Sequence, residues 1–270
     1  MPLVNIGTFN INSVKSRLPI LEAWLAASGA PEILALQETK CTTADFPAAA
    51  FEALGYKCAA GGMRQYNGVA VLSKIGAPEE VRFGFEDGLE TARAEEEARL
   101  MRVKIGGINI INSYVPQGQS VESPAYEAKL RFFERLARLV SRCYRPDELV
   151  LWVGDMNVAP LDIDVAPEYG LLDDVMTNTE VRAAYGDVMN WGFTDLFRRF
   201  HKEPGSYSFW DYRVPNAAKR NIGWLIDRMN ATAPLASRCR GVWIKRSLRM
   251  MEKPSDHTAV IGEFEIPERL

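Results

Sequence analysis

Short apolar runs separated by polar turns recur along the chain and predict β-strands. The run from Leu149 to Val153 contains no polar position, which is typical of a strand buried on both faces. Two of the runs are separated only by the Gly106-Gly107 turn. We expect strands at residues 4–11, 32–37, 69–74, 100–105, 108–115, 149–153, 206–210, 222–230, 241–245 and 258–264.

Helical periodicity is visible in fewer places. The segment 17–27 carries its leucines on one face, which predicts a helix. The clearest helix is expected over 124–143, because a serine precedes it at a favourable capping position and a proline takes the first helical position. Its apolar stripe consists of Leu130, Phe133, Leu136 and Val140. A further helix, broken around Gly192, is expected over 187–200.

The strands outnumber the helices, and the two do not alternate strictly. This order argues against a plain doubly wound sheet and favours a mixed α/β fold, with two sheets packed on each other and helices outside. The length of 270 residues fits one large domain or two small ones. Because no internal repeat or linker is visible, we expect a single domain over residues 1–270.

Composition and charge narrow the class of protein. The chain is 47% hydrophobic and 25% charged, which is ordinary for a globular domain. A net charge of -3 argues against a protein that coats nucleic acid, but not against an enzyme with a local basic face around an acidic centre. No apolar run approaches the roughly 20 residues of a membrane helix. The four scattered cysteines predict neither disulfides nor a zinc site. We expect a cytoplasmic monomer without a membrane partner.

Polar residues at the ends of the predicted strands are the candidate chemical groups, because dinucleotide, P-loop, zincin and serine-hydrolase motifs are absent from the sequence. These strand-end residues are Asn10, Asn12, Glu38, Asp155, Asn157, Asp227, Asp256 and His257. Clusters of carboxylate and amide oxygens suit a hard cation such as Mg²⁺. A histidine beside them suits the charge that develops on a phosphoryl group. The pattern therefore predicts metal-assisted hydrolysis of a phosphate ester.

Each of these residues has a simpler explanation when it is taken alone. Glu38 would suit a solvated loop, and Asp155 with Asn157 would suit a turn. The final Asp-His pair could be a cap and a hydrogen-bonded histidine. Asp227 is harder to explain, because it interrupts an apolar run where an unpaired buried carboxylate is costly. Exposure at a strand edge is the alternative for that residue.

Taken together, these segments carry a family resemblance. In chain order they are Phe9-Asn10-Ile11-Asn12, Leu36-Gln37-Glu38-Thr39-Lys40, Tyr66-Asn67-Gly68-Val69-Ala70, Asn112-Ser113-Tyr114-Val115-Pro116-Gln117-Gly118, Gly154-Asp155-Met156-Asn157, Ser208-Phe209-Trp210-Asp211-Tyr212-Arg213, Asn221-Ile222-Gly223-Trp224 with Asp227, and Ser255-Asp256-His257. The chain resembles the exonuclease III family of abasic-site endonucleases, within the endonuclease/exonuclease/phosphatase superfamily. The likeness runs from about residue 4 to 264.

The resemblance implies a fold and a metal site. The fold would be a four-layered α/β sandwich, two packed mixed β-sheets flanked by helices, with the site at one end of the two sheets. Glu38 would be the principal Mg²⁺ ligand, with Asn10, Asn12 and Asp256 near the metal. Mn²⁺ would substitute for Mg²⁺.

The resemblance also implies catalytic roles. Asp155 would activate or position the attacking water. Asn157 and His257 would contact the scissile phosphate, and Asp227 would pair with His257. Tyr114 would orient the phosphate. A carboxylate beside a histidine raises the imidazole pKa, so His257 would face the phosphate as a cation.

Further residues are implied to bind the substrate. Phe209, Trp224 and Ile226 would line a pocket for a flipped-out abasic sugar, and Trp210 would also bind the substrate. Extruding a site that already lacks its base requires less unstacking, which is one source of selectivity. Lys40, Tyr66 and Arg213 are expected along the DNA backbone, although a solvated surface position is the alternative for the two cations.

The expected activity is cleavage of duplex DNA 5′ to abasic sites, with removal of 3′ blocking groups and 3′-to-5′ exonuclease action at the same site. One departure from the family pattern is Leu225, where many members carry arginine. The corresponding phosphate contact would be lost, or supplied by Arg213, Arg220 or Arg228. Two alternatives are a phosphodiesterase of another branch, acting on RNA or phospholipid, and a non-catalytic DNA-binding paralogue.

Overall fold

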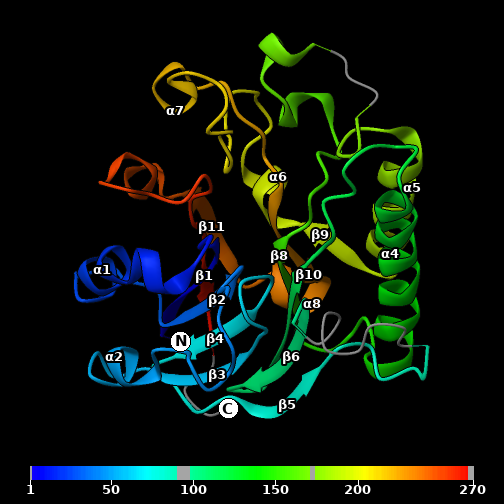
Figure 1. Cartoon of the computed structure of the whole chain (residues 1–270). Helices are drawn as coiled ribbons and strands as arrows, with labels where there is room; N and C mark the ends of the chain where they lie inside the picture. Colours follow the sequence, from blue (N-terminus) through cyan, green and yellow to red (C-terminus); the bar gives the residue numbers. More distant parts are fainter. Residues whose placement is uncertain (1, 90–97, 171–173, 267–270) are drawn as a thin grey trace.

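Two six-stranded sheets pack face to face in the computed structural model, with helices outside them (Figure 1). The structure describes residues 2–89, 98–170 and 174–266. The expected four-layered α/β sandwich of two mixed sheets is confirmed.

The first sheet has the strand order β11-β12-β1-β2-β4-β3. Only β1 and β2 run parallel, and the other neighbours are antiparallel. The bounds are β1 Leu3–Asn10, β2 Ile33–Gln37, β3 Lys57–Gly61, β4 Val69–Ser73, β11 Cys239–Ile244 and β12 Val260–Glu265. The parallel register sets Asn10 beside Gln37, so the carboxyl ends of both strands meet.

The second sheet has the order β5-β6-β7-β8-β10-β9, with β7 and β8 parallel. The bounds are β5 Glu79–Phe83, β6 Leu100–Ile105, β7 Ile108–Tyr114, β8 Val150–Asp155, β9 Phe193–Asp195 and β10 Asp227–Thr232. The register aligns Tyr114 with Asp155 across β7 and β8, and Asp227 with Asp155 across β10 and β8. Three polar side chains therefore share one end of this sheet.

The inner faces of the sheets form one apolar core. It includes Ile6 and Val71 from the first sheet and Val103, Leu151 and Met229 from the second, all nearly or fully buried. Alternation along each strand places these side chains between the sheets and sends their neighbours outward. The close packing of the two sheets fixes the positions of the polar residues at the strand ends.

The outward faces are covered by helices. Helices α1 (Val14–Leu25) and α2 (Ala48–Glu52) cover the first sheet, and α4 (Pro124–Cys143) and α5 (Thr179–Asn190) cover the second (Figure 1). The Ser123 side chain caps α4, as expected. The remaining helical segments are short: α6 Leu196–Phe200, α7 Ala217–Arg220, α8 Ala233–Ala236, and 3₁₀ turns at Asp162–Asp164, Pro167–Tyr169 and Arg246–Met250.

Three expected elements differ from the structure. Residues 206–210 make only isolated bridges through Phe209, to Trp224 and His257, and the strand expected over 222–230 begins at Asp227. Both segments instead follow the rim of a cleft. The helix expected over 187–200 is the end of α5, then β9, then α6. Gly192 has φ 140, a conformation outside the helical region, and it separates these elements.

Candidate active site

Polar side chains from both sheets meet at the end where β1, β2, β7 and β8 finish. Oxygen or nitrogen atoms of Glu38, Asp155 and His257 lie within 4.8 Å of one another. Asn10, which is fully buried, lies between the two carboxylates: its Nδ2 donates to Glu38 Oε1 at 2.8 Å and to Asp155 Oδ2 at 2.9 Å. Three residues far apart in sequence thus form one acidic centre.

This donor set fits a hard divalent cation, because carboxylate oxygens from two different strands converge on one point. The structure balances the charge of Glu38 with Lys40, whose Nζ lies 2.8 Å from Glu38 Oε2. Lys40 Nζ also donates to Asn12 Oδ1 at 2.5 Å, and Asn12 Nδ2 donates to Asp256 Oδ1 at 2.9 Å. Asn12 and Asp256 therefore join the centre through a polar chain. Burial works to raise the pKa of Glu38, but Lys40, together with Asn10 and His257, outweighs it, so the pKa is lowered.

His257 connects Asp227 to the acidic centre. Its Nδ1 lies 2.8 Å from Asp227 Oδ2, and its Nε2 lies 3.7 Å from Asp155 Oδ2. Burial alone would lower the pKa of His257, but the carboxylates of Asp227 and Asp155 outweigh it and raise the pKa to about 10. The two carboxylates therefore favour the protonated form of the imidazole. Asp227 has the partner that its apolar surroundings require, so strand-edge exposure is excluded.

Asp155 is buried and held from both sides. Its Oδ1 accepts from the backbone N–H of Asn157 at 2.9 Å, while Oδ2 accepts from Asn10. Burial raises the pKa of Asp155 to about 7; His257 opposes this and Asp227 adds to it. Asn157 has φ 49, which an asparagine tolerates better than most residues, and its Nδ2 donates to Val115 O at 2.9 Å. Burial raises the pKa of Tyr114 well above its usual range, so its hydroxyl stays protonated.

A cleft of about 630 Å³ opens beside this centre. Phe209, Trp224 and Ile226 line it, and the ring centroids of Phe209 and His257 lie 4.8 Å apart. Trp210 does not line the cleft: it is 1% exposed and packs in a separate cluster with Tyr207 and Ile222. Successive residues of an extended segment point to opposite sides, so Phe209 and Trp210 face different surroundings.

The three residues expected along the DNA backbone occupy different positions around the site. Arg213 lines the cleft and pairs with Asp211 at 2.6 Å. Lys40 lies in the acidic centre, and its backbone N–H donates to Asn67 O. This hydrogen bond holds the loop that contains Tyr66 beside the Glu38–Lys40 turn. The Tyr66 side chain is 66% exposed. Tyr66 itself does not line the cleft.

Leu225 is fully buried in the core between the sheets. Of the three arginines considered as substitutes for a phosphate contact, only Arg213 lines the cleft. Arg228 is fully buried and pairs with Asp164 at 2.5 Å and Asp195 at 2.8 Å, so it cannot reach a substrate. Arg220 lies exposed on the short helix α7.

The sequence did not indicate several residues of the cleft. They are Gln117, Gln119, Tyr169, Asp174, Met176 and Asp211. Tyr169 packs on Trp224, with ring centroids 4.9 Å apart, and so extends the aromatic wall. Asp211 and Gln117 stand within the segments that carry the family resemblance, which is the only signal that could have found them.

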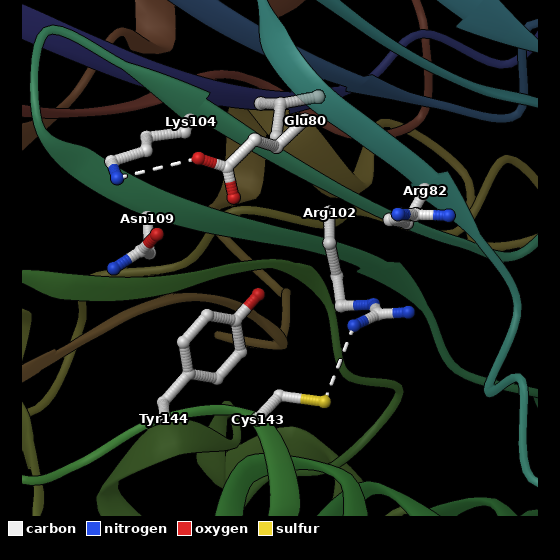
Figure 2. A pocket seen from close by; sticks show the side chains of 8 residues that line it. Glu80, Arg82, Arg102, Lys104, Asn109, Cys143 and Tyr144 are labelled. Atoms are coloured by element: carbon white, nitrogen blue, oxygen red, sulfur yellow. Dashed lines mark hydrogen bonds and ion pairs between the residues drawn. The ribbon is translucent and has the colours of Figure 1, made fainter.

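A second, smaller hollow of about 140 Å³ lies at the other end of β6 and β7, beside the end of α4 (Figure 2). Its cations are paired with acids: Arg102 with Glu86, and Lys104 with Glu80 at 3.4 Å. Arg102 also donates to Cys143 Sγ at 3.4 Å. These pairs distinguish it from the acidic centre, where carboxylates outnumber their cations.

The fold and the acidic centre together define a metal-dependent hydrolase. The chain belongs to the Endonuclease/Exonuclease/phosphatase family, whose model matches residues 7–257. Exodeoxyribonuclease III of Haemophilus influenzae is 32% identical over 269 residues, covering 95% of this chain and 98% of that protein. Within the described residues no helix is both long and apolar enough to cross a membrane.

Solved structures agree with this assignment. An AP endonuclease from Archaeoglobus fulgidus has a TM-score of 0.91 and 40% identity, covering 97% of this chain and all (100%) of that one. The 3'-5' exonuclease NExo from Neisseria meningitidis has a TM-score of 0.88 and 30% identity, covering 97% of this chain and 99% of that one. A Neisseria 3' phosphatase NExo structure, bound to a product DNA hairpin, is equally similar, with a TM-score of 0.88 and 31% identity over 97% of this chain and 99% of that one.

Proposed function

We propose that this protein is a Mg²⁺-dependent DNA-repair phosphodiesterase that acts as a monomer and cuts duplex DNA on the 5′ side of abasic sites. One observation carries the proposal: Glu38, Asp155 and His257 converge within 4.8 Å beside a cleft with an aromatic wall. Phosphate chemistry and a binding surface for an extruded sugar are thus adjacent. A base-free nucleotide leaves the helical stack at lower cost than a normal one, which favours it as the substrate.

Glu38 would be the principal metal ligand, and the hydrogen bond from Asn10 Nδ2 would hold its carboxylate in place. Asn12 and Asp256 would support it through Lys40. Mg²⁺ is the preferred ion because the converging donors are carboxylate oxygens, and Mn²⁺ suits the same donors. When bound, such a cation neutralises charge on the phosphoryl oxygens.

Asp155 would accept a proton from the attacking water. A general base works best when its pKa lies near the working pH, and burial brings the pKa of Asp155 to about 7. Hydrogen bonds from Asn10 and from the Asn157 backbone fix the carboxylate, so the base is held in one orientation. The water would attack phosphorus as the bond to the 3′ oxygen breaks.

His257 would stabilise the negative charge that builds on the phosphate. Its ring is held by Asp227, whose carboxylate favours the protonated imidazole. Tyr114 keeps its proton and lines the cleft, so its hydroxyl is available as a donor to a phosphate oxygen. Asn157 lines the cleft next to Asp155 and would contact the same phosphate.

A second activity is proposed at the same site: removal of 3′ blocking groups and of 3′-terminal nucleotides. It involves the same attack on a phosphorus atom, with a chain end in the cleft instead of an internal site. The Neisseria NExo structures, described as a 3' phosphatase and a 3'-5' exonuclease at 31% and 30% identity, support it.

The test is a duplex that carries one abasic analogue. Purified protein should nick it 5′ to the analogue with Mg²⁺ and should leave it intact in EDTA. A recessed end and a 3′-phosphate, each in a separate duplex, measure the second activity. Intact abasic duplex at stoichiometric enzyme would overturn the endonuclease proposal.

Asp155→Asn separates chemistry from binding. The amide keeps the size of the carboxylate but cannot accept the proton, so cleavage should be lost while DNA binding, measured by fluorescence anisotropy, is retained. Turnover by this variant at the wild-type rate would show that the assigned role is wrong. A parallel panel of RNA and phospholipid phosphodiesters tests the other branches of the superfamily, whose enzymes would ignore the abasic duplex.

A further inference from the structure

The start of α4, with its N-cap Ser123, lies behind the wall of the cleft, and Ser123, Tyr126 and Lys129 bond to the loops that form this wall. Residues three apart share a helix face, so these side chains form one row. Ser123 Oγ donates to Gly118 O at 2.6 Å, and Tyr126 Oη donates to Asn178 Oδ1 at 3.0 Å. Both partners lie in loops next to the cleft. The start of α4 therefore anchors these loops.

Lys129 is the most unusual member of this row, because it is a fully buried lysine. Its Nζ donates to three backbone carbonyls: Val175 O at 2.5 Å, Asn157 O at 2.6 Å and Gln117 O at 3.1 Å. An ammonium has three donors, and each is used here.

The three carbonyls belong to three separate segments of the cleft wall. Gln117 and Asn157 line the cleft themselves, and Val175 lies between Asp174 and Met176, which also line it. The Gln117 segment follows β7, the Asn157 segment follows β8, and Val175 lies in the loop before α5. One cation connects all three segments.

Packing supports the same connection. Gly118 has φ 101, and a Cβ placed on it would lie 3.3 Å from both Lys129 Cδ and Val175 Cβ. The loop therefore lies directly on the lysine stem, and a larger residue at position 118 would displace it. The aliphatic stem and the ammonium act on the same segments.

The energetic cost of burying Lys129 argues against a role in stability alone. Burying an ammonium is costly: burial lowers the pKa of Lys129 to about 7 even with Asp155 and Asp174 favouring the charged form. The three donated hydrogen bonds require the ammonium, because a neutral amine has only two N–H groups. A methionine would fill the same space without that cost, but would leave three buried carbonyls without this donor. The lysine contributes something that an apolar side chain cannot.

We propose that Lys129 is a positioning residue, whose ammonium holds the Gln117, Asn157 and Val175 segments in the arrangement that the phosphate-contacting groups need. This inference rests on the proposed function of the same cleft. The main consequence of this positioning concerns Asn157. Its backbone is in the left-handed region, its N–H orients Asp155, and its carbonyl is held by Lys129.

The test compares Lys129→Met with Tyr185→Phe. Tyr185 is a buried residue of α5 whose Oη donates to Asn230 Oδ1 at 3.1 Å, so its loss also removes a buried hydrogen bond, but away from the cleft. Both variants should lose stability. Only Lys129→Met should lose kcat, by about 100-fold, as expected when reacting groups shift by about 1 Å, and with little change in KM.

Lys129→Gln keeps amide donors for two carbonyls and should give an intermediate kcat. It also provides the comparison if Lys129→Met does not fold. Wild-type kcat in either variant, with Tm lowered as in Tyr185→Phe, would show that the lysine is only structural and would overturn the inference.

Hydrogen–deuterium exchange distinguishes this inference from the proposed function. Lys129→Met should raise exchange at 117–119, 157–159 and 174–178 but not in β10, whether or not abasic DNA is the substrate. Unchanged exchange in those three segments would refute the positioning role. Failure of wild-type protein to cut abasic duplex would refute only the proposed function.

Discussion

Asp227 Oδ2 and His257 Nδ1 lie 2.8 Å apart, and both side chains are buried. Because Nδ1 bonds to this carboxylate, the other ring nitrogen faces Asp155, at 3.7 Å. The pair thus fixes both the ring orientation and the protonation state of the histidine.

Asp227→Asn should therefore reduce kcat. The amide cannot balance the imidazolium charge, so the pKa of His257 falls and the ring loses its preferred orientation. Carboxylates that orient a functional histidine are typically worth about 10–100-fold. Steady-state cleavage of the abasic duplex measures the loss. Asn230→Ala, on the same strand but remote from the cleft, is the control. Equal kcat in Asp227→Asn and wild type would exclude this role.

Divalent metal should stabilise the folded protein through Glu38. A ligand that binds only the native state adds about 1.4 kcal/mol at about ten times its Kd. Thermal unfolding in EDTA and in Mg²⁺ should show a higher Tm with the ion for wild type. Glu38→Gln should lose this difference, because it removes a carboxylate from the centre. Glu22→Gln, at an exposed position on α1, should keep it. A Mg²⁺-dependent Tm in Glu38→Gln equal to that of wild type would contradict the assigned ligand.

The aromatic wall should determine selectivity for an extruded sugar. Trp224→Leu removes a ring that packs on Tyr169 and faces the cleft. Loss of about 1.4 kcal/mol of stacking would lower kcat/KM for abasic duplex about tenfold. Cleavage of a 3′-phosphate should fall less, because no internal nucleotide is extruded. Trp243→Leu, on β11 and outside the cleft, controls for loss of a tryptophan. An equal loss of kcat/KM on both substrates would show that the aromatic wall does not select for an extruded sugar.

The strand ends of the site could be predicted because the preceding runs are continuously buried. β2 and β8 are buried at every position, so an apolar run ended by Glu38 or by Asp155 marks a strand end. β3 and β5 could not be predicted in this way. β3 is rich in alanine and only half-buried, and β5 is an exposed, charged edge strand. Such strands form because a neighbour pairs with them.

Residues brought in by tertiary contacts were missed for a related reason. Lys129 is polar in a helix whose stripe is apolar, and a lysine is normally expected in solvent. Its burial depends on carbonyls contributed by three other segments. Tyr169 lies in a short turn with no periodic pattern.

A last prediction concerns stability in acid, far from the metal centre. Arg135 makes two hydrogen bonds to Asp87, at 2.7 and 2.9 Å, and both side chains are largely buried. The hydrogen bonds from Arg135 lower the pKa of Asp87 below its usual 3.8. A carboxyl group whose pKa is lower in the folded state stabilises that state above the unfolded-state pKa. This contribution disappears as the pH falls through the folded-state value.

Asp87→Asn should therefore unfold more easily than wild type at pH 7, and the difference should narrow in acid, mostly within about pH 5 to pH 1. Below the folded-state pKa, Asp87 is neutral in both states and resembles the amide. Urea unfolding in EDTA at several pH values measures the free energy of unfolding without a metal contribution. Asp147→Asn is the matched control, because its pair with Arg145 is solvent-exposed and screened. A difference between Asp87→Asn and wild type that stays constant with pH would mean that this carboxylate does not contribute through its charge.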